Sequence, residues 1–171
     1  MRDAVDGILD RWARARPDLD ASPMAVIGRI SRLSRLLGQA VREHLAEQGV
    51  EPWEFDVLAT LRRTGPPFTL SPGELAASAM IGGAALTHRA DRLVERGLIT
   101  REVDPDNRRR VLITLTTEGL ELVDRLVTGH VAHEDRLLAT LGPEDREITA
   151  DLLRRLLISL GDTGDTGRPG A

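Results

Sequence analysis

Apolar residues recur at helical spacing along most of the chain. In residues 3–15 they stand at i, i+3, i+4 and i+7, which predicts a short helix that ends before Pro17. A longer amphipathic stretch, residues 22–49, has Pro23 in the first helical position and predicts a long helix. A third helix is predicted over residues 52–63, ahead of a Gly-Pro-Pro turn.

The next segment predicts two short helices joined by a turn. The sequence Ser-Pro-Gly-Glu matches a capping box, in which Ser71 accepts from an N–H three residues on and Glu74 reaches back to the N–H of Ser71. It opens a predicted helix at 72–78. A second helix is predicted at 84–96, closed by Gly97. This arrangement is typical of a helix-turn-helix.

The second of these helices has an inner and an outer face. Its inward residues are expected to be Leu86, Ala90, Leu93 and Val94. The outward face then carries Asp91, which would repel a phosphate and is expected instead to fix an arginine.

The spacing of apolar residues then changes from 3.6 to 2. Segments 98–103 and 110–115 read as strands, and the arginine-rich connector 104–109 contains turn-forming residues, so a β-hairpin follows the helix-turn-helix directly. Two further helices are predicted, one opened by Thr116 and reaching Leu141, the other beginning at Pro143.

These elements predict a mainly α (α+β) fold, a winged helix-turn-helix with dimerisation helices at both ends. We expect an N-terminal extra helix and first dimerisation helix at 1–49, a DNA-binding lobe at 50–117, C-terminal dimerisation helices at 118–160 and a disordered tail at 161–171. A winged helix cannot cover the long apolar stripes at both ends, so we expect a homodimer.

Composition narrows the class of protein. The 171 residues predict one domain with extensions, and the absence of cysteine excludes disulfides, thiolate metal sites and thiol redox sensing. No apolar run approaches the roughly 20 residues of a membrane span, and the charged N-terminus is unlike a signal peptide. We therefore expect a soluble cytoplasmic protein without cofactors. All 23 basic residues are arginine, whose planar fork suits phosphate and carboxylate.

The net charge of −4 would argue against nucleic acid, but the charge is unevenly distributed. Nine arginines and six acidic residues in 62–110 give +3, and 14 arginines and 21 acidic residues in the remainder give −7. A basic centre fits phosphate binding, although a solvated face can have the same counts.

Residues on the outer face of the second short helix, together with the connector arginines, form the predicted DNA contact. A helix enters the major groove, and arginines at a wing tip enter the neighbouring minor groove. The expected DNA-binding residues are Ala84, Ala85, Thr87, His88, Arg92, Arg108, Arg109 and Arg110. An ordinary surface helix and a solvated hairpin are the alternative.

Catalytic and metal sites are not indicated. The sequence has no nucleophile elbow, phosphate-cradling glycine loop, H-E-x-x-H or plausible triad, so we expect no enzyme. His130, His133 and Glu134 stand at i, i+3 and i+4, a spacing that a metal could use, but we interpret them as a solvated helix face without metal.

A small-ligand site has weaker signals. Trp12 lies at the end of an extra helix and is either a packing residue or a stacking platform for a flat ligand. Asp56, Arg89 and Arg101 stand next to apolar residues, as in a partly buried ion-pair site or in ordinary interface salt bridges.

Three runs carry a resemblance to a known family. They are LTHRADRLVERGLITR at 86–101, DPDNRR at 104–109 and LTTEG at 115–119. The region from about 55 to 160 resembles the MarR family of transcriptional regulators. WARARPDLD at 12–20, SPMAVIGR at 22–29 and FDVLATLRR at 55–63 are similar to the urate-responsive PecS and HucR type, which carries the extra N-terminal helix.

The resemblance implies a ligand site between the dimerisation region and the DNA-binding lobe. The residues it implies are Trp12 as stacking wall, Asp56 as the carboxylate that senses the anion, Arg101 as anion partner, Arg89 as link into the recognition helix, and Arg63. The sequence departs from the family at Asn107, where the wing usually has Asp, and at Gly82 and Gly83, where the branch often has Ser-Ser.

The implied function is a homodimeric repressor that binds a double-stranded, pseudopalindromic DNA operator and is released by urate or a related purine. A different anion, such as a phenolic acid or a polycarboxylate, is an alternative effector. An interaction dimer without specific DNA is the alternative from another class.

Overall fold

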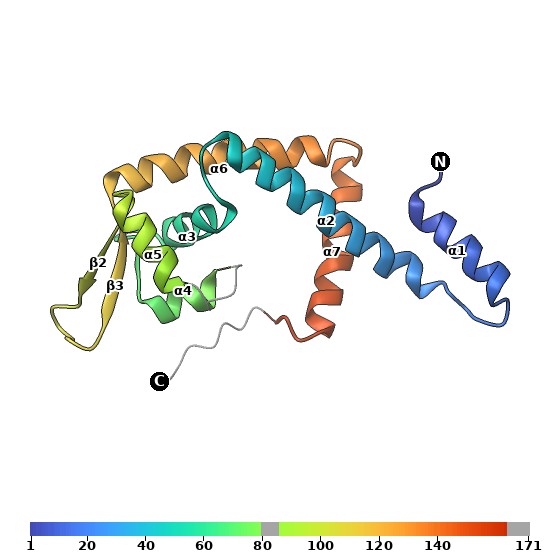
Figure 1. Ribbon diagram of the computed structural model, residues 1–171, viewed down its shortest axis with the longest axis horizontal. Coiled ribbons are helices and arrows are strands. Elements are labelled where there is room, and N and C mark those ends of the chain that lie inside the picture. Colours follow the sequence, from blue (N-terminus) through green and yellow to red (C-terminus); the bar gives the residue numbers. More distant parts are fainter. Residues whose placement is uncertain (80–85, 164–171) are drawn as a thin grey trace. The chain divides into compact units, whose positions relative to one another are not determined.

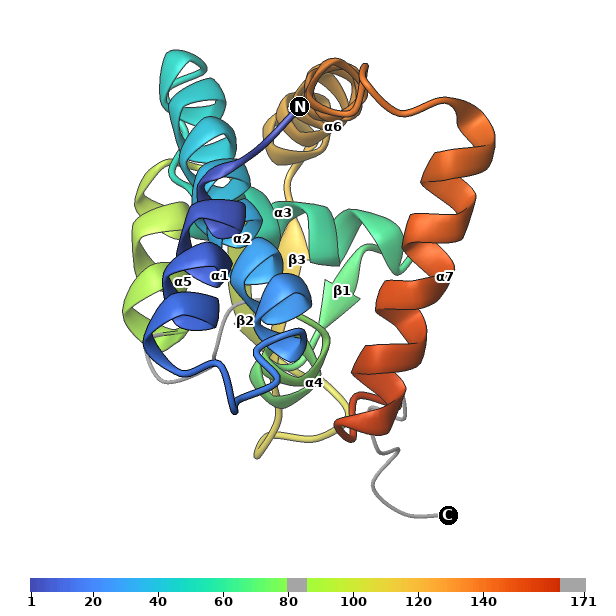
Figure 2. The ribbon, with the colours of Figure 1, turned by 90° about the vertical axis from the view of Figure 1, so that its right-hand side faces the viewer.

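The computed structural model describes residues 1–79 and 86–163, without the side chains of residues 86–88. It divides into two compact units, residues 1–43 and 44–171. The first unit holds α1 (Ala4–Ala15) and most of α2 (Pro23–Glu47). The second holds α3 (Pro52–Arg63), β1 (Thr69–Leu70), α4 (Pro72–Ser78), α5 (Leu86–Glu95), β2 (Ile99–Val103), β3 (Val111–Leu115), α6 (Thr117–Leu137) and α7 (Pro143–Ser159). Figure 1 labels these elements except β1, which is labelled in Figure 2.

Helix α1 is attached to α2 through its first turn. Asp3 caps α1 by accepting from the N–H groups of Val5 and Asp6, and Asp6 accepts from the N–H of Asp3 at 2.8 Å. Arg29 of α2 bonds both carboxylates, at 2.8 Å to Asp3 and 2.7 Å to Asp6. Val5 is buried against Gly28, where a Cβ would lie 3.3 Å from a Val5 methyl group. The extra N-terminal helix is therefore held on α2 by specific ion pairs and by the packing of Val5.

The second unit contains a three-stranded antiparallel sheet in the order β1-β3-β2. Ile99 pairs with Leu115 and Val103 with Val111, so β2 and β3 form the predicted hairpin. The two-residue strand β1, which the sequence pattern did not predict, pairs with the opposite edge of β3. The hairpin forms the left-hand end of this unit in Figure 1, with the connecting loop at its tip.

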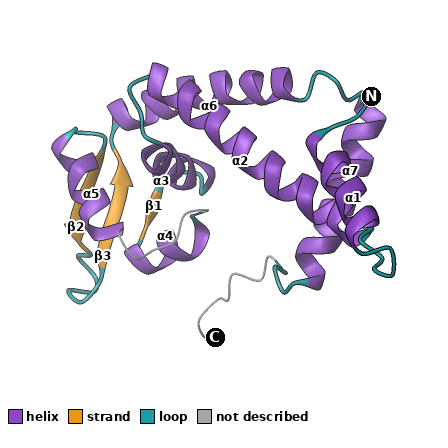
Figure 3. Cartoon of the chain, turned by 45° about the vertical axis from the view of Figure 1, so that its right-hand side comes forward, coloured by secondary structure: helices purple, strands orange, loops and turns teal. Residues whose placement is uncertain are grey.

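The inner face of α3 supplies the centre of the core. Three fully buried residues, Val57, Leu58 and Leu61, lie on this helix. Side chains from α4, α5, β2, β3, α6 and the turn before β2 complete the buried cluster: Leu75, Ala90, Leu93, Leu98, Ile99, Ile113, Leu115 and Val123. The strands and α3 to α6 gather around this core in Figure 3. Helix α7 stands apart from the sheet in Figure 2, and none of its residues is buried.

Helix α6 begins in close contact with the corner between α5 and β2. The Thr116 hydroxyl accepts from the N–H of Gly119 at 3.0 Å and donates to the carbonyl of Gly97 at 2.7 Å. A Cβ on Gly119 would lie 2.0 Å from the carbonyl oxygen of Leu98. Only glycine therefore permits this approach of the helix to the backbone.

Most predicted elements are confirmed, and α3 and α4 have the predicted bounds. The capping box of Ser71 and Glu74 is formed, and Gly97 follows α5 with a φ of 68°. Val94 was wrongly predicted to point inward. It is 40% exposed, because Ala90 and Leu93 define the buried stripe and Val94 stands about 100° around the helix from Leu93.

Some boundaries differ from the sequence prediction or lie outside the described residues. Helix α6 ends at Leu137 rather than Leu141, with Leu138 as its C-cap and a turn following. The predicted helix start at Ala84, the pair Gly82 and Gly83, and tail residues 164–171 lie outside the described residues. Among the helices that are described, none has the length and apolar character needed to traverse a lipid bilayer.

Replacing Gly119 with alanine should destabilise the fold, because the added Cβ forces α6 away from the Leu98 carbonyl. We expect Gly119→Ala to lower the free energy of unfolding by about 2–3 kcal/mol, measured by urea denaturation. Gly73→Ala is the matched control, since a Cβ there meets no atom within 4 Å and alanine is the better helix former. Equal stability of the two variants would contradict this account of Gly119.

Candidate DNA interface and effector site

Helices α4 and α5 form the candidate DNA-reading element. The first turn of α4 is fixed by Ser71 and Glu74, and α5 is held by Ala90 and Leu93 in the core. Of the predicted base-reading residues, Thr87 and His88 belong to the first turn of α5. Ala84 and Ala85 lie outside the described residues.

Asp91 on the exposed side of α5 pairs with an arginine, as predicted. Its Oδ1 lies 3.1 Å from Nη1 of Arg101 on β2. Both side chains are partly exposed, so the pair contributes little to stability. Its importance is positional, because it links the helix that would read bases to the first strand of the hairpin.

Arg89 and Arg92 are directed toward α3. Their guanidinium carbons lie 5.7 Å and 5.0 Å from the centroid of the Trp53 ring, within range of a cation–π contact. Arg92, predicted to contact DNA, therefore rests on Trp53. Sequence reasoning did not assign Trp53 any role, since a tryptophan in the first turn of a helix looks like an ordinary packing residue.

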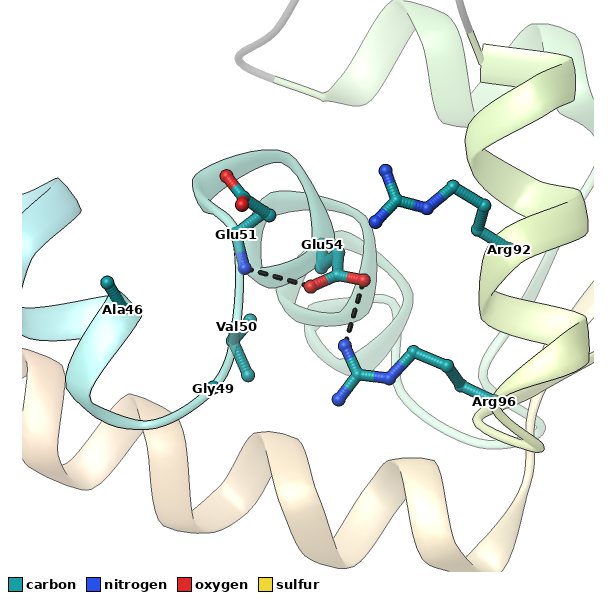
Figure 4. A pocket seen from close by; sticks show the side chains of 7 residues that line it. All are labelled: Ala46, Gly49, Val50, Glu51, Glu54, Arg92 and Arg96. Carbon is teal, nitrogen blue, oxygen red and sulfur yellow. Dashed lines mark hydrogen bonds and ion pairs between the residues drawn. The ribbon is translucent and has the colours of Figure 1, made fainter.

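A pocket of about 340 Å³ lies beside this stack, between the end of α2, the start of α3 and the end of α5. Its lining residues are Ala46, Gly49, Val50, Glu51, Glu54, Arg92 and Arg96. Figure 4 shows the Arg92 and Arg96 side chains extending from α5 toward the Glu54 carboxylate.

Glu54 is the buried charge of this pocket, with 2% of its surface exposed. Its Oε2 accepts from the N–H of Glu51 at 2.8 Å, and its Oε1 lies 2.8 Å from Nη1 of Arg96. The sequence Glu-Pro-Trp-Glu at 51–54 is a capping-box pattern that could have revealed the first contact. No local sequence pattern could have predicted the contact with Arg96, which connects the end of α5 to the start of α3.

The arginines of the hairpin loop have different surroundings. Arg108 and Arg109 are exposed and form no ion pair with any residue that the structure describes. Arg110, predicted to stand with them at the tip, instead donates from Nη2 to both carboxylate oxygens of Glu74, at 3.0 and 3.1 Å. The Oδ1 of Asn107 accepts from the backbone N–H of Arg109 at 3.1 Å. Asn107 thus stabilises the turn through the backbone rather than by orienting a guanidinium.

The expected effector residues occupy several elements. Asp56 is on α3 and is 9% exposed. Arg63, at the end of the same helix, donates to the carbonyl of Ser78 at the end of α4. Arg89 lies over Trp53 and Arg101 pairs with Asp91, while Trp12 belongs to the first unit and is 38% exposed.

Comparison with known proteins decides the family. Residues 48–110 match the model of the MarR family. The regulator PecS of Dickeya dadantii (strain 3937) is 40% identical over 152 residues, which cover 89% of this chain and 92% of PecS. This chain belongs to the MarR family.

Two solved MarR-type structures are also similar. Sco3205 of Streptomyces coelicolor, solved in complex with DNA, is 26% identical, with a TM-score of 0.75 over 85% of this chain and 92% of that one. BpsR of Bordetella bronchiseptica, whose DNA binding is regulated by 6-hydroxynicotinic acid, is 26% identical, with a TM-score of 0.68 over 77% and 91%. The relatives named here are transcriptional regulators, not enzymes.

Membership identifies the parts of the second unit. This MarR protein is a DNA-binding transcriptional regulator with a winged helix-turn-helix fold. Helices α4 and α5 are the helix-turn-helix, and the β2–β3 hairpin is the wing.

Three histidines of this MarR protein cluster between the end of α2, α3 and α6. The rings of His44 and His133 stack with centroids 4.4 Å apart, and His130 packs on Phe55 at 4.6 Å. His130 also lies 3.2 Å from Glu134. The prediction of a solvated face was wrong for His130 and His133, because both rings pack on neighbouring elements. Among the described residues no group of three or more His, Cys, Asp or Glu is arranged to hold a metal.

The cluster should make stability depend on pH. Burial lowers the pKa of the His44 imidazole below its ordinary value of 6.5, and the neighbouring charge of His133 lowers it further. The folded chain then binds this proton less readily than the unfolded chain, so stability is full above about pH 6.5 and falls as the pH drops below it.

Thermal unfolding between pH 7.5 and pH 5.5 tests this expectation. The wild type should lose stability over this range, and His44→Gln should lose less. Arg42→Gln, at an exposed position of the same helix, is the control and should keep the wild-type pH dependence. Identical pH dependence in all three proteins would show that His44 does not carry the effect.

Proposed function

We propose that this MarR protein is a homodimeric repressor that binds a pseudopalindromic operator and is released by a small aromatic anion, urate or a related purine. Its half-sites should lie about one helical turn, ~10 bp, apart. The observation that carries the effector assignment is the 40% identity with PecS over 152 residues, 89% of this chain, together with the resemblance of residues 12–29 to the urate-responsive type. We also assign the effector site to the five residues that the family resemblance implies.

Free positive charge at the wing tip supports operator contact. Arg108 and Arg109 have no carboxylate partner among the described residues, so both guanidinium groups are available to phosphates or to the minor groove. Thr87 and His88, in the first turn of α5, are our proposed base readers.

Uncovered apolar faces support a homodimer. Helix α7 exposes apolar side chains along its length and buries none of its residues. Helix α2 in the first unit exposes apolar side chains as well. Those with at least half of their surface exposed are Val26, Ile27, Leu33, Ile148, Leu152, Leu157 and Ile158. So much exposed apolar surface marks an interaction site, and a second copy of the chain offers the same surface in return.

An anion that binds Arg101 would compete with Asp91 for the same guanidinium. Because the Asp91–Arg101 pair joins α5 to β2, losing it would free α5 to shift relative to the wing. Such release requires that the anion bind more tightly to the form that does not fit the operator. Asp56, buried on α3, is the carboxylate that we expect to sense the added charge, and Trp12 is the proposed stacking wall.

A second effector class is supported by BpsR, which responds to 6-hydroxynicotinic acid. This compound is also a flat ring with an anionic group, so stacking on Trp12 would serve both. A polycarboxylate without a ring would gain nothing from Trp12. The effect of Trp12→Ala therefore separates flat anions from other anions.

The operator experiment tests the function directly. Fluorescence anisotropy at fixed salt should show tighter binding to the DNA upstream of the gene than to random duplex, and urate should weaken that binding. Asp56→Ala should still bind the operator but respond little to urate. Arg101→Ala also loses the pair with Asp91, so it should bind the operator more weakly and respond little to urate. Specific binding that ignores urate would exclude this effector. Equal binding of both duplexes would leave only an interaction dimer without specific DNA.

The dimer has a separate test. Replacing Leu152 and Leu156 of α7 with aspartate should convert the dimer to a monomer in analytical ultracentrifugation and weaken operator binding at least tenfold, since one half-site is then lost. Glu144→Gln and Glu147→Gln on the same helix are controls that should remain dimeric. A doubly substituted protein that is still a dimer would refute a role for this face.

A further inference from the structure

The side chain of Arg110 is turned from the wing toward α4. Its Nη2 lies 3.0 and 3.1 Å from the two carboxylate oxygens of Glu74, and its Nη1 lies 3.9 Å from Oδ2 of Asp104. The single positive charge of Arg110 therefore faces two negative charges. Such a guanidinium has little capacity left to neutralise a phosphate or to release counterions from DNA.

Glu74 is a fixed carboxylate rather than a mobile surface residue. It accepts from the backbone N–H of Ser71 at 2.8 Å and from the Ser71 hydroxyl at 2.6 Å. These bonds, and then the charge of Arg110, hold the pKa of the Glu74 carboxyl below its usual range. Because the carboxylate is already held by the capping box, Arg110 loses less entropy in pairing with it than it would with a free side chain.

The backbone of Arg110 closes the loop at the tip of the wing. Its carbonyl accepts from the N–H of Asp104 at 2.9 Å, and its N–H donates to the carbonyl of Asn107 at 2.8 Å. The residue thus sits where the loop rejoins β3, with its side chain on α4. Movement of the wing against the helix-turn-helix would have to break this pair.

We propose that Arg110 is a positioning residue, which sets the angle of the wing through Glu74 of α4, and that phosphate contact at the wing belongs to Arg108 and Arg109. This inference rests on the proposed operator binding and corrects the expectation that all three arginines contact DNA. The family usually has an aspartate at the position of Asn107. Because asparagine lacks that negative charge, the Arg110–Glu74 pair becomes more important for holding the wing in place.

Salt dependence separates the two roles. Operator affinity is measured by anisotropy across a range of salt concentrations for the wild type, Arg109→Gln and Arg110→Gln. A lost phosphate contact reduces the slope of log K against log salt by about 0.9. Both subunits of the dimer carry the substitution, so for Arg109→Gln we expect twice this reduction, about 1.8. For Arg110→Gln we expect an unchanged slope and affinity weakened about two- to fivefold, the range of an exposed ion pair.

Glu74→Gln should change operator affinity in opposite directions under the two possible roles of Arg110. Glutamine keeps an acceptor for the N–H of Ser71 but loses the charge. If Arg110 positions the wing, operator binding weakens, and adding Arg110→Gln weakens it no further. If Arg110 contacts phosphate and Glu74 merely restrains it, Glu74→Gln frees the guanidinium and binding tightens.

Ser71→Ala is the control for helix capping. It removes the hydroxyl cap of α4 but leaves the Glu74–Arg110 pair, so any effect of a weakened helix appears without loss of the pair. Circular dichroism checks that each variant is folded.

Three outcomes would overturn the proposal. They are a slope reduced by about 1.8 in the Arg110→Gln dimer, tighter binding in Glu74→Gln, or affinity that neither substitution changes. Failure of wild-type protein to prefer operator over random duplex would instead refute the proposed function.

Discussion

A carboxylate fixed at the start of a helix is the attachment point on which much of this structure depends. In α1, α3 and α4 the third helical residue accepts a hydrogen bond from the backbone of its own N-cap, and these residues are Asp6, Glu54 and Glu74. Each also binds an arginine from another element, in the order Arg29, Arg96 and Arg110. The helix start orders the carboxylate first, and the planar guanidinium then joins two elements at little further entropic cost.

This use of arginine reconciles an acidic chain with DNA binding. Four of the nine arginines between residues 62 and 110 pair with described carboxylates: Arg62, Arg96, Arg101 and Arg110. Arg89 and Arg92 lie over Trp53 instead. Most positive charge in the basic centre therefore holds the lobe together, and what is left for phosphate is concentrated at the wing tip. A count of charges along the sequence cannot make this distinction.

Helix ends, the hairpin and the buried face of α5 were predictable because they depend on residues that are close together in the sequence. The capping sequence of Ser71 and Glu74 predicted the start of α4, the Gly-Pro-Pro turn predicted the end of α3, and alternating residues predicted the hairpin. The predicted hydrophobic stripe of α5 was correct at Ala90 and Leu93 and wrong at Val94, while the side chain of Leu86 lies outside the described residues. Strand β1 was not predicted because it has only two residues, which adopt strand structure only by pairing with β3.

The candidate site was less predictable because its partners are distant in sequence. That Asp91 binds an arginine followed from its charge beside a DNA-binding face, but the choice of Arg101 did not. The pairing of Arg110 with Glu74, 36 residues away, could not be predicted from its place beside Arg108 and Arg109. Family resemblance named Asp56, Arg89 and Arg101, yet it gave no sign of Trp53 or Glu54.

The close contact between Gly119 and the backbone of Leu98 couples the movement of α6 to that of the DNA-binding lobe. With no gap between the helix and the α5–β2 corner, the start of α6 must turn together with the DNA-binding lobe. The helix is 21 residues long, about 30 Å, so a rotation of about 10° at the lobe displaces its far end by about 5 Å. A small change of angle beside the wing thus displaces the opposite end of α6 by a distance similar to the pitch of an α-helix.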